Sequence, residues 1–228
     1  YKRQGYGDSP YQSVSTFAGN PYFIDLEELI KKELLTKEEC EACDWGGSES
    51  YVDYEKIYLS RYKLLRKAYE KADLKTDPDY AEFLKEEKDW LQDYCLFMAI
   101  KNDQKGICWI DWPEELKDRH SKAVKEAEKE LAEEIEFYRF QQYCFTTQWR
   151  KLKAYANKKD ISIIGDVPIY VALDSSDAWA NPEMLQFDED YDPKAVAGCP
   201  PDAFSATGQL WGNPLYDWKA LKKDGYGW

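Results

Sequence analysis

The sequence predicts an α/β fold, and three observations carry that prediction. Residues 26–157 hold apolar side chains at helical spacing, with residues typical of helix starts between them. Residues 161–171, ISIIGDVPIYV, form a short and nearly continuous β-branched run, as in strands that are buried on both faces. This run follows the last helical stretch closely, as in one turn of an α/β barrel or of a doubly wound sheet.

The composition indicates a globular, acidic protein with enough residues for a sizeable core. Among 228 residues, 33% are charged and 43% hydrophobic, and 31 basic against 44 acidic side chains give a net charge of −13. Such a field repels phosphate backbones and anionic bilayers, so we expect no nucleic-acid partner and no membrane partner. The sequence also contains no apolar run long enough to span a bilayer.

The first residues and the cysteines bear on location. The opening YKRQGYGDSP is basic and then turn-forming, unlike a signal peptide. The chain starts with Tyr rather than Met, and we expect the natural N-terminus to lie upstream. The cysteines are spaced irregularly, which favours a reduced protein of the cytoplasm. They are Cys40, Cys43, Cys95, Cys108, Cys144 and Cys199.

The helical region is predicted to begin at Asp25, because its side chain can cap a helix whose apolar face includes Leu26 and Leu29. Thr36 and Glu39 have the spacing of a capping box, in which each side chain bonds the backbone of the other residue. These two starts predict short helices that precede the longer ones.

Longer helices are predicted further along the chain. Helical spacing indicates helices over residues 52–72 and 79–101, and the second half of the latter is apolar enough to be buried. Pro113 suits a first helical turn. A long helix is predicted over residues 121–156, where Glu dominates the first half and Lys or Arg the end, as the helix dipole favours.

Asp166 interrupts the predicted buried strand together with Gly165. A buried carboxylate needs a partner or a purpose, and polar residues at the carboxyl ends of barrel strands line active sites. The alternative is a structural carboxylate that caps a turn or pairs with an arginine.

Residues 198–218 form a long aromatic stretch that fits neither a helical nor a strand period. Loops of this length without regular structure are usually lids or binding loops. The alternative is a loop that is only packed on the core. The early segment GYGDSPYQS contains turn-forming residues but gives little indication of a binding site, so by itself it favours a surface turn.

Metal and histidine chemistry find little support. Cys40 and Cys43 form a lone CxxC, with neither a second pair for zinc nor a preceding strand for a redox motif. His120 is the only histidine, which excludes a histidine-based triad and a multi-histidine metal centre. We expect no metal and no cofactor.

Three long motifs, taken together, resemble the 4-α-glucanotransferases, also called amylomaltases or disproportionating enzymes. The motifs are GYGDSPYQSVSTFAGNPYFIDLEEL, GDVPIYVALDSSDAWANPEMLQFDED and AGCPPDAFSATGQLWGNPLYDW. VDYEKIYLSRYKLLRKA and WLQDYCLFMAIK resemble the helical insert of that family. The resemblance covers nearly the whole chain, with the motifs in the family's order.

The resemblance implies part of a (β/α)8 TIM-barrel glycoside hydrolase with a mostly helical inserted subdomain. It implies transfer of an α-1,4-glucan segment to the 4-hydroxyl of another glucan or glucose, by a retaining mechanism with two carboxylates and no cofactor. The substrate partner is then a maltooligosaccharide or another α-glucan. The family's nucleophilic Asp and acid/base Glu belong to later strands, so we expect an incomplete barrel without those residues here.

The resemblance also assigns binding roles at matching positions. Asp166 matches a strand-end carboxylate that bonds the sugar and supports the nucleophile, and Tyr11 matches an aromatic near the scissile bond. Residues 200–211 resemble a lid that excludes water from a glycosyl-enzyme. The implied substrate-binding residues are Ser9, Tyr11, Asp166, Asp202, Phe204, Gln209 and Trp211. A second, remote glucan site is implied at Tyr6 and Tyr58.

The implied organisation has three parts. Residues 1–25 are a substrate-contacting loop after a barrel strand, residues 26–120 the helical inserted subdomain, and residues 121–228 a barrel helix, strand and lid. Two alternatives remain open: a non-catalytic glucan-binding protein built from the same parts, and a helical interaction domain around residues 26–157. The second leaves the loop motifs unexplained.

Overall fold

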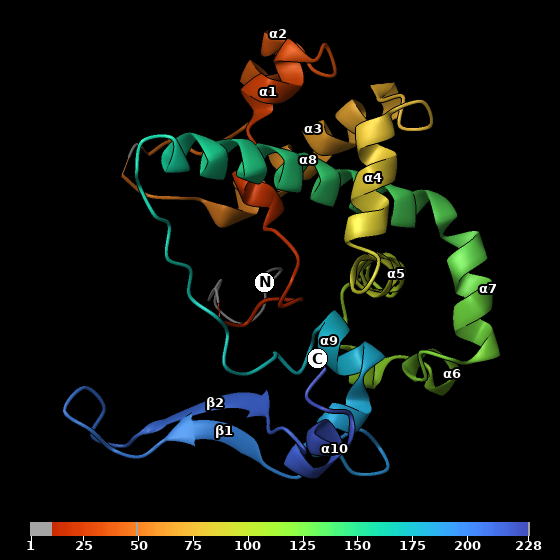
Figure 1. Ribbon diagram of the computed structural model, residues 1–228, viewed down its shortest axis with the longest axis vertical. Coiled ribbons are helices and arrows are strands. Elements are labelled where there is room, and N and C mark those ends of the chain that lie inside the picture. Colours follow the sequence, from red (N-terminus) through yellow and green to blue (C-terminus); the bar gives the residue numbers. More distant parts are fainter. Residues whose placement is uncertain (1–10, 49, 228) are drawn as a thin grey trace. The chain divides into compact units, whose positions relative to one another are not determined.

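A computed structural model describes residues 11–48 and 50–227 (Figure 1). The chain divides into two compact units. The helical unit contains Gly19–Leu91 and Glu136–Ile164. The hairpin unit contains Tyr1–Ala18, Gln92–Ile135 and Gly165–Trp228. Each unit is therefore assembled from segments that lie far apart in the sequence.

Most helices of the helical unit begin at a side-chain cap. The unit contains the α-helices α1 (Leu26–Lys31), α2 (Lys37–Glu41), α3 (Tyr54–Lys71) and α4 (Pro78–Glu86), the 3-10 helix η2 (Pro21–Phe23), and most of α8 (Ala132–Asn157). The Asp25 side chain accepts the Glu27 amide at the start of α1, which confirms the predicted cap. At α2 both bonds of the predicted capping box are present between Thr36 and Glu39.

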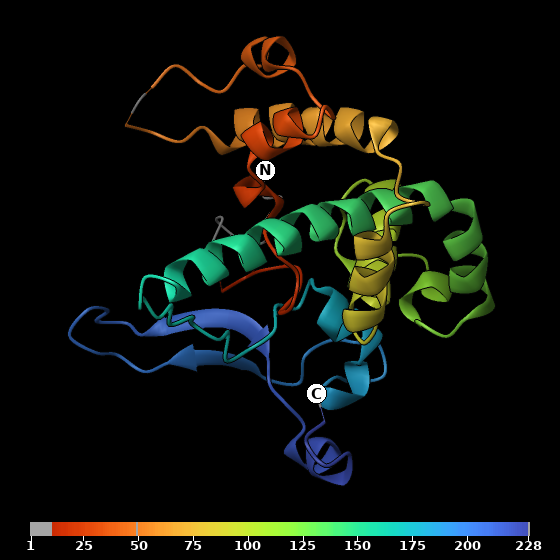
Figure 2. The same ribbon diagram turned by 45° about the horizontal axis from the view of Figure 1, so that its top comes forward.

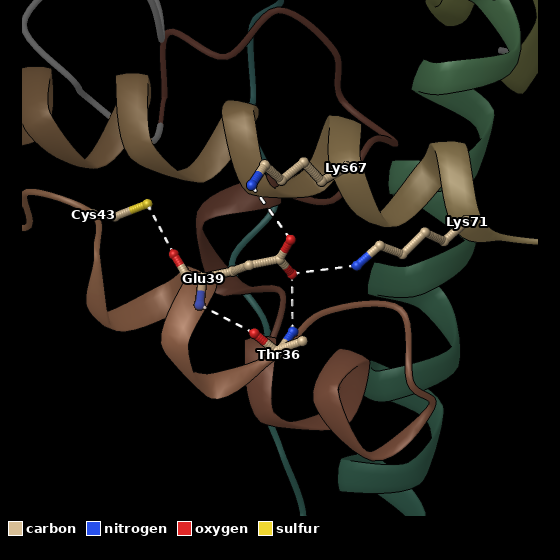
Figure 3. A network of polar contacts seen from close by, with 5 residues as sticks. All are labelled: Thr36, Glu39, Cys43, Lys67 and Lys71. Carbon is tan, nitrogen blue, oxygen red and sulfur yellow. Dashed lines mark hydrogen bonds and ion pairs between the residues drawn. The ribbon is translucent and has the colours of Figure 1, made fainter.

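Glu39 also joins α2 to α3, as Figure 3 shows. Its Oε1 lies 3.3 Å from the Nζ of Lys67, and its Oε2 lies 3.3 Å from the Nζ of Lys71. The same Oε2 accepts the Thr36 amide at 3.0 Å. One carboxylate thus caps a helix and pairs with two lysines of another helix.

Two glutamine side chains of α8 each accept one hydrogen bond from, and donate one to, the backbone of a single residue, as a neighbouring strand would. Gln142 accepts the Gly19 amide at 2.8 Å and donates to the Gly19 carbonyl at 3.0 Å. Gln148 makes the same pair of bonds with Asp25, at 2.7 and 3.1 Å. Gly19 is required for the close approach, because a Cβ there would lie 2.0 Å from the ring of Phe145. The residues before α1 are thereby held on α8.

The core of the helical unit draws its buried side chains from α1, α3, α8 and the residues just before and after α1. Burying these side chains removes apolar surface from water, which is the main favourable term in folding. Its buried members are Ile24, Leu29, Leu35, Leu64, Leu65, Ala68, Phe137, Phe140 and Cys144.

The hairpin unit has shorter helices and two strands. Its α-helices are α5 (Leu91–Asp103, beginning one residue before the unit), α6 (Glu114–Lys117), α7 (Lys122–Glu130), α9 (Ser176–Ala180) and α10 (Trp218–Lys223), and its 3-10 helices are η3 (Trp109–Asp111) and η4 (Pro182–Met184). Strands β1 (Val196–Cys199) and β2 (Gln209–Pro214) pair antiparallel and run side by side as one ribbon (Figure 2). Gly198 faces Leu210, and Cys199 faces Gln209.

Buried indoles form the core of the hairpin unit. Trp109 and Trp179 have no exposed surface. The Trp109 Nε1 donates to the Leu173 carbonyl at 2.7 Å, and the Trp179 Nε1 donates to the Leu116 carbonyl at 3.0 Å. Each ring therefore fills the core while its single donor is satisfied, as buried indoles require.

Two predicted helices are interrupted. The helix expected over residues 79–101 is divided into α4 and α5, because Glu87 leaves the helix and its carboxylate binds Arg150 at 3.0 Å and the Trp90 indole at 2.8 Å. The helix expected over residues 121–156 is divided into α7 and α8 at Leu131. No glycine or proline marks either break, so local propensity predicted continuous helices.

The predicted buried strand over residues 161–171 is wrong. Residues 161–168 are extended coil that follows α8, without a strand arrow in Figure 1. Ile164 is 94% exposed and Val167 73% exposed. β-Branched residues favour extended backbone, but a strand exists only where another strand accepts its hydrogen bonds. In residues 11–48 and 50–227, no strand pairs with this segment.

The stretch 198–218 is more regular than predicted. Instead of a loop without regular structure, it contains β2 and the start of α10. Gly208 closes the turn between the strands with φ +73°, a conformation that glycine adopts at little cost. Among the described helices, none is both long and apolar enough to cross a bilayer.

Candidate functional site

Tyr11 and Asp166 meet in the hairpin unit. The Tyr11 hydroxyl donates to the Asp166 Oδ2 at 2.7 Å, across 155 residues of sequence. This bond and the negative charge of Asp166 raise the pKa of Tyr11, so the phenol remains a protonated donor at neutral pH. Both side chains are exposed, which corrects the expectation that Asp166 is buried in a strand.

Gln12 connects the same N-terminal segment to the hairpin. Its Nε2 donates to the Trp211 carbonyl at 3.1 Å and to the Asn213 Oδ1 at 2.7 Å. Asn213 is buried, and its Nδ2 donates to the Val171 carbonyl at 2.9 Å. Side-chain amides therefore tie together the segment before residue 18, the segment after Asp166 and strand β2.

The turn of the hairpin carries Asp202 and Phe204. The Asp202 Oδ1 accepts the amides of Phe204 at 2.9 Å and of Ser205 at 2.7 Å, which fixes the turn locally. The Phe204 side chain is 96% exposed. An exposed aromatic on a small, internally bonded turn is available to contact a ligand.

Aromatic rings form a row beside strand β2. The Tyr170 ring centroid lies 6.4 Å from that of Trp211 and 6.1 Å from that of Tyr216, the latter pair being stacked. Tyr216 lies 5.5 Å from Trp218 by the same measure. Burial raises the pKa of Tyr216 to about 12, so this phenol stays neutral at physiological pH. Flat apolar faces of this kind suit sugar rings.

The predicted substrate-binding residues have different places in the structure. Tyr11, Asp166 and Trp211 belong to one connected group through Gln12, Asn213 and the hydrogen bonds given above. Gln209 adjoins the group, because its Oε1 accepts the Trp211 Nε1 at 3.0 Å.

The other predicted residues lie elsewhere. Asp202 and Phe204 stand at the hairpin turn, where the Asp202 carboxylate accepts two amides of that turn. Tyr58 belongs to α3 of the helical unit, where its ring lies 4.6 Å from that of Tyr62. Ser9 and Tyr6 lie outside the described residues.

Sequence reasoning missed the polar residues that hold this group together. Gln12 stands directly after Tyr11 in SPYQS, and Asn213 precedes a proline, so both read as turn residues. Asp177 also went unnoticed: its Oδ2 accepts the Thr16 amide at 2.9 Å, and burial raises its pKa to about 6. The sequence carries little signal for it, because Asp177 ends the polar stretch DSSD just before Ala178 and Trp179.

Disulfides need paired cysteines, and metal sites need clustered ligating side chains. All six cysteines are free thiols. Along residues 11–48 and 50–227, histidine, cysteine, aspartate and glutamate side chains do not gather in threes as a metal ion would need.

Known proteins resemble this chain along nearly its whole length. Residues 2–228 match a family model described as 4-alpha-glucanotransferase. Over 224 residues the chain is 50% identical to a 4-alpha-glucanotransferase of Clostridium butyricum, which covers 98% of this chain and 46% of that protein. Over 226 residues it is 46% identical to a 4-alpha-glucanotransferase of Thermus thermophilus, which covers 97% of this chain and 44% of that protein.

A solved structure agrees. The amylomaltase from Streptococcus agalactiae in complex with acarbose matches with a TM-score of 0.92 and 38% identity, over 99% of this chain and 46% of that one. The chain thus spans less than half of the length of the relatives it matches.

Proposed function

We propose that this chain, which belongs to the 4-alpha-glucanotransferase family, is part of an enzyme that moves segments of α-1,4-glucan. The enzyme transfers a segment to the 4-hydroxyl of another glucan or of glucose. The observation that carries the proposal is the connected group of Tyr11, Gln12, Asp166 and β2, because it joins three distant family motifs. The likeness to an amylomaltase that holds acarbose supports an oligosaccharide as the ligand.

Retaining transfer needs two carboxyl groups at the scissile bond, one as nucleophile and one as acid and then base. We assign both to parts of the enzyme outside this chain, and a supporting role to Asp166. Its Oδ2 already accepts the Tyr11 hydroxyl, so the other carboxylate oxygen is the one we assign to a sugar hydroxyl. Tyr11 then offers its ring face to the sugar while its hydroxyl orients the carboxylate.

The hairpin is the proposed lid. A glycosyl-enzyme survives until a sugar hydroxyl arrives only if water is kept away. Phe204 at the turn and Trp211 on β2 are exposed apolar surfaces, so glucan that covers them is shielded from water. We propose Asp202 and Gln209 as the polar groups beside them, and Ser9 as a further contact. Tyr6 and Tyr58 remain the proposed second glucan site.

The complete enzyme is proposed to contain a (β/α)8 barrel. Exposed Ile164 and Val167 support further parts of the enzyme beside residues 161–171, because apolar side chains of this size are normally covered in a folded protein. Residues 1–25, 26–120 and 121–228 keep their proposed roles as loop, helical insert and barrel part with lid.

Location and partners follow from the same proposal. A cytoplasmic enzyme suits free cysteines, since oxidising compartments favour disulfides. The net charge of −13 argues against nucleic acid as a partner.

The test is glucan transfer by the full-length protein with maltotriose as substrate. We expect Asp166→Asn to lower the transfer rate on the order of a hundredfold, because a polar group at the reaction centre is lost, while the circular dichroism spectrum is unchanged. Asp188→Asn is the matched control, because Asp188 caps an exposed turn of the same unit.

Three outcomes decide between the functions. Undiminished transfer by Asp166→Asn contradicts the role of Asp166. Wild-type full-length protein that forms no new maltooligosaccharides contradicts the enzyme. Tight maltoheptaose binding without transfer, measured by calorimetry, favours the non-catalytic glucan-binding protein instead.

A further inference from the structure

Residues 13–18, called here the strap, are bound by the first turn of helix α9. The Ser176 amide and Oγ both donate to the Val14 carbonyl, at 2.9 and 3.2 Å. The Thr16 amide donates to the Asp177 Oδ2 at 2.9 Å. Helix α9 therefore holds the strap at two points: Ser176 donates to the Val14 carbonyl, and Asp177 accepts the Thr16 amide.

The carboxylate of this anchor is buried. Asp177 is 6% exposed, and in the described part of the chain no lysine, arginine or histidine forms an ion pair with it. Burial without a counter-ion penalises the charged form, which raises its pKa to about 6 although the Thr16 hydrogen bonds act to lower it. Ionised at neutral pH, Asp177 still needs the Thr16 amide as a partner.

The strap is also hydrogen-bonded within itself. The Ser15 Oγ accepts the amides of Phe17 at 3.1 Å and of Ala18 at 3.2 Å, and the Ser13 Oγ donates to the Ser15 carbonyl at 2.7 Å. Ser15 is buried. A shift at Thr16 is thus passed along the backbone rather than absorbed by a flexible loop.

Tyr11 and Gln12 come directly before the strap. Their bonds to Asp166, Trp211 and Asn213 span 2.7 to 3.1 Å, so a displacement of their backbone by an ångström breaks them. Asp177 itself touches none of these side chains in any bond described above. Its effect on them runs through the strap.

We propose that Asp177 is a positioning residue of the glucan site, whose hydrogen bond to the Thr16 amide holds the strap so that Tyr11 and Gln12 reach Asp166 and strand β2. The identity of the ligand rests on the proposed function. The hydrogen bond between Asp177 and the Thr16 amide rests on geometry alone. Tyr216 is the titratable group that faces Asp177 from the segment after β2, and it stays neutral because its own pKa is raised to about 12.

The first experiment needs no sugar. Amide exchange of the full-length protein is followed by NMR for wild type, Asp177→Ala, Asp177→Asn and the control Asp188→Ala. Asp177→Ala removes the acceptor, Asp177→Asn keeps one in Oδ1, and Asp188→Ala removes a carboxylate that accepts two amides elsewhere in the hairpin unit. We expect the Thr16 amide to exchange about tenfold faster in Asp177→Ala only.

The second experiment measures maltotriose transfer by the full-length protein with the same substitutions. We expect kcat/KM to fall about tenfold for Asp177→Ala, and to be restored in Asp177→Asn. Equal losses in the Ala and Asn variants overturn the proposal, as does an unchanged Thr16 exchange rate in Asp177→Ala. If the Thr16 amide exchanges faster in Asp177→Ala but wild type transfers no glucan, the proposed function is contradicted, while the role of Asp177 in holding the strap is supported.

A pH series covers the case in which Asp177→Ala does not fold. In wild type, exchange of the Thr16 amide relative to its intrinsic rate is expected to rise as pH falls through about 6, since a protonated carboxyl is a weaker acceptor. In Asp177→Asn this rise is absent. A Thr16 amide with the same pH profile in both proteins overturns the proposal.

Discussion

Two carboxylates bind backbone amides in the two units, and their surroundings are opposite. Glu39 in the helical unit has a side chain that is 24% exposed and lies between Lys67 and Lys71. Asp177 in the hairpin unit is 6% exposed and has backbone amides as partners. The pKa of Glu39 is lowered, chiefly by its hydrogen bond from the Thr36 amide, whereas burial raises the pKa of Asp177 to about 6.

The difference teaches that the surroundings, and not the amide hydrogen bond, decide how a carboxylate changes stability with pH, because the bond lowers the pKa in both cases and burial alone raises it for Asp177. A carboxylate with a lowered pKa contributes stability above its ordinary pKa, and that contribution is lost as pH falls through the lowered value. A carboxyl with a raised pKa contributes stability at low pH, and that contribution is lost as pH rises through the raised value. The charge of Glu39 therefore stabilises the fold. The charge of Asp177 destabilises it, although its hydrogen bond fixes the position of the strap.

The largest expected effect tests the Asp177 half of this comparison. Relative to Asp177→Asn, wild type is expected to lose on the order of 3 kcal/mol of stability between pH 3 and pH 7, because the pKa moves from 3.8 to about 6 on folding. Urea unfolding of both proteins at several pH values measures the difference. A constant difference across this range contradicts the buried charge.

A smaller effect is expected at the cap that Glu39 shares. Thr36→Ala removes the side chain that accepts the Glu39 amide at 3.2 Å, so the helical unit is expected to lose about 1 kcal/mol. Thr76→Ala is the control, because the Thr76 hydroxyl bonds an exposed side chain and caps no helix. Urea midpoints that fall equally in both variants show that the cap contributes nothing specific.

The smallest effect is expected for Glu39→Gln, which keeps an acceptor for the Thr36 amide and removes the charge that meets the lysines. Ion pairs this exposed contribute little and are screened by salt. We expect a slight loss of stability that disappears at 1 M NaCl and as pH falls through the Glu39 pKa. A loss that persists in high salt assigns Glu39 a packing role instead.

The parts of the fold that sequence predicted are those that local chemistry determines. The caps at Asp25 and Thr36 use side chains and amides two or three residues apart, and both are present. The break at Glu87 depends on Arg150, and β2 depends on β1, so neither has a local signal. Residues 161–171 carry the composition of a strand, but no partner strand lies among the residues that the structure describes, and composition alone cannot supply one.

The candidate site divides in the same way. Tyr11, Asp166 and Trp211 were predicted because each stands in a motif whose letters are distinctive. Gln12 and Asp177 were missed because their partners lie 161 to 201 residues away in the sequence. Their roles exist only once the chain has folded, which is why a turn-forming glutamine and a helical aspartate looked ordinary.

The two-stranded ribbon has a consequence for handling the protein. Each strand pairs on one side only within the described residues, and open strand edges are templates for pairing with another molecule. Leu210 on β2 is 81% exposed, so the ribbon offers apolar contact as well as hydrogen bonds. The net charge of −13 keeps copies apart at neutral pH and low salt. Concentrated protein is therefore expected to aggregate at acidic pH or high salt, through contacts made by this ribbon.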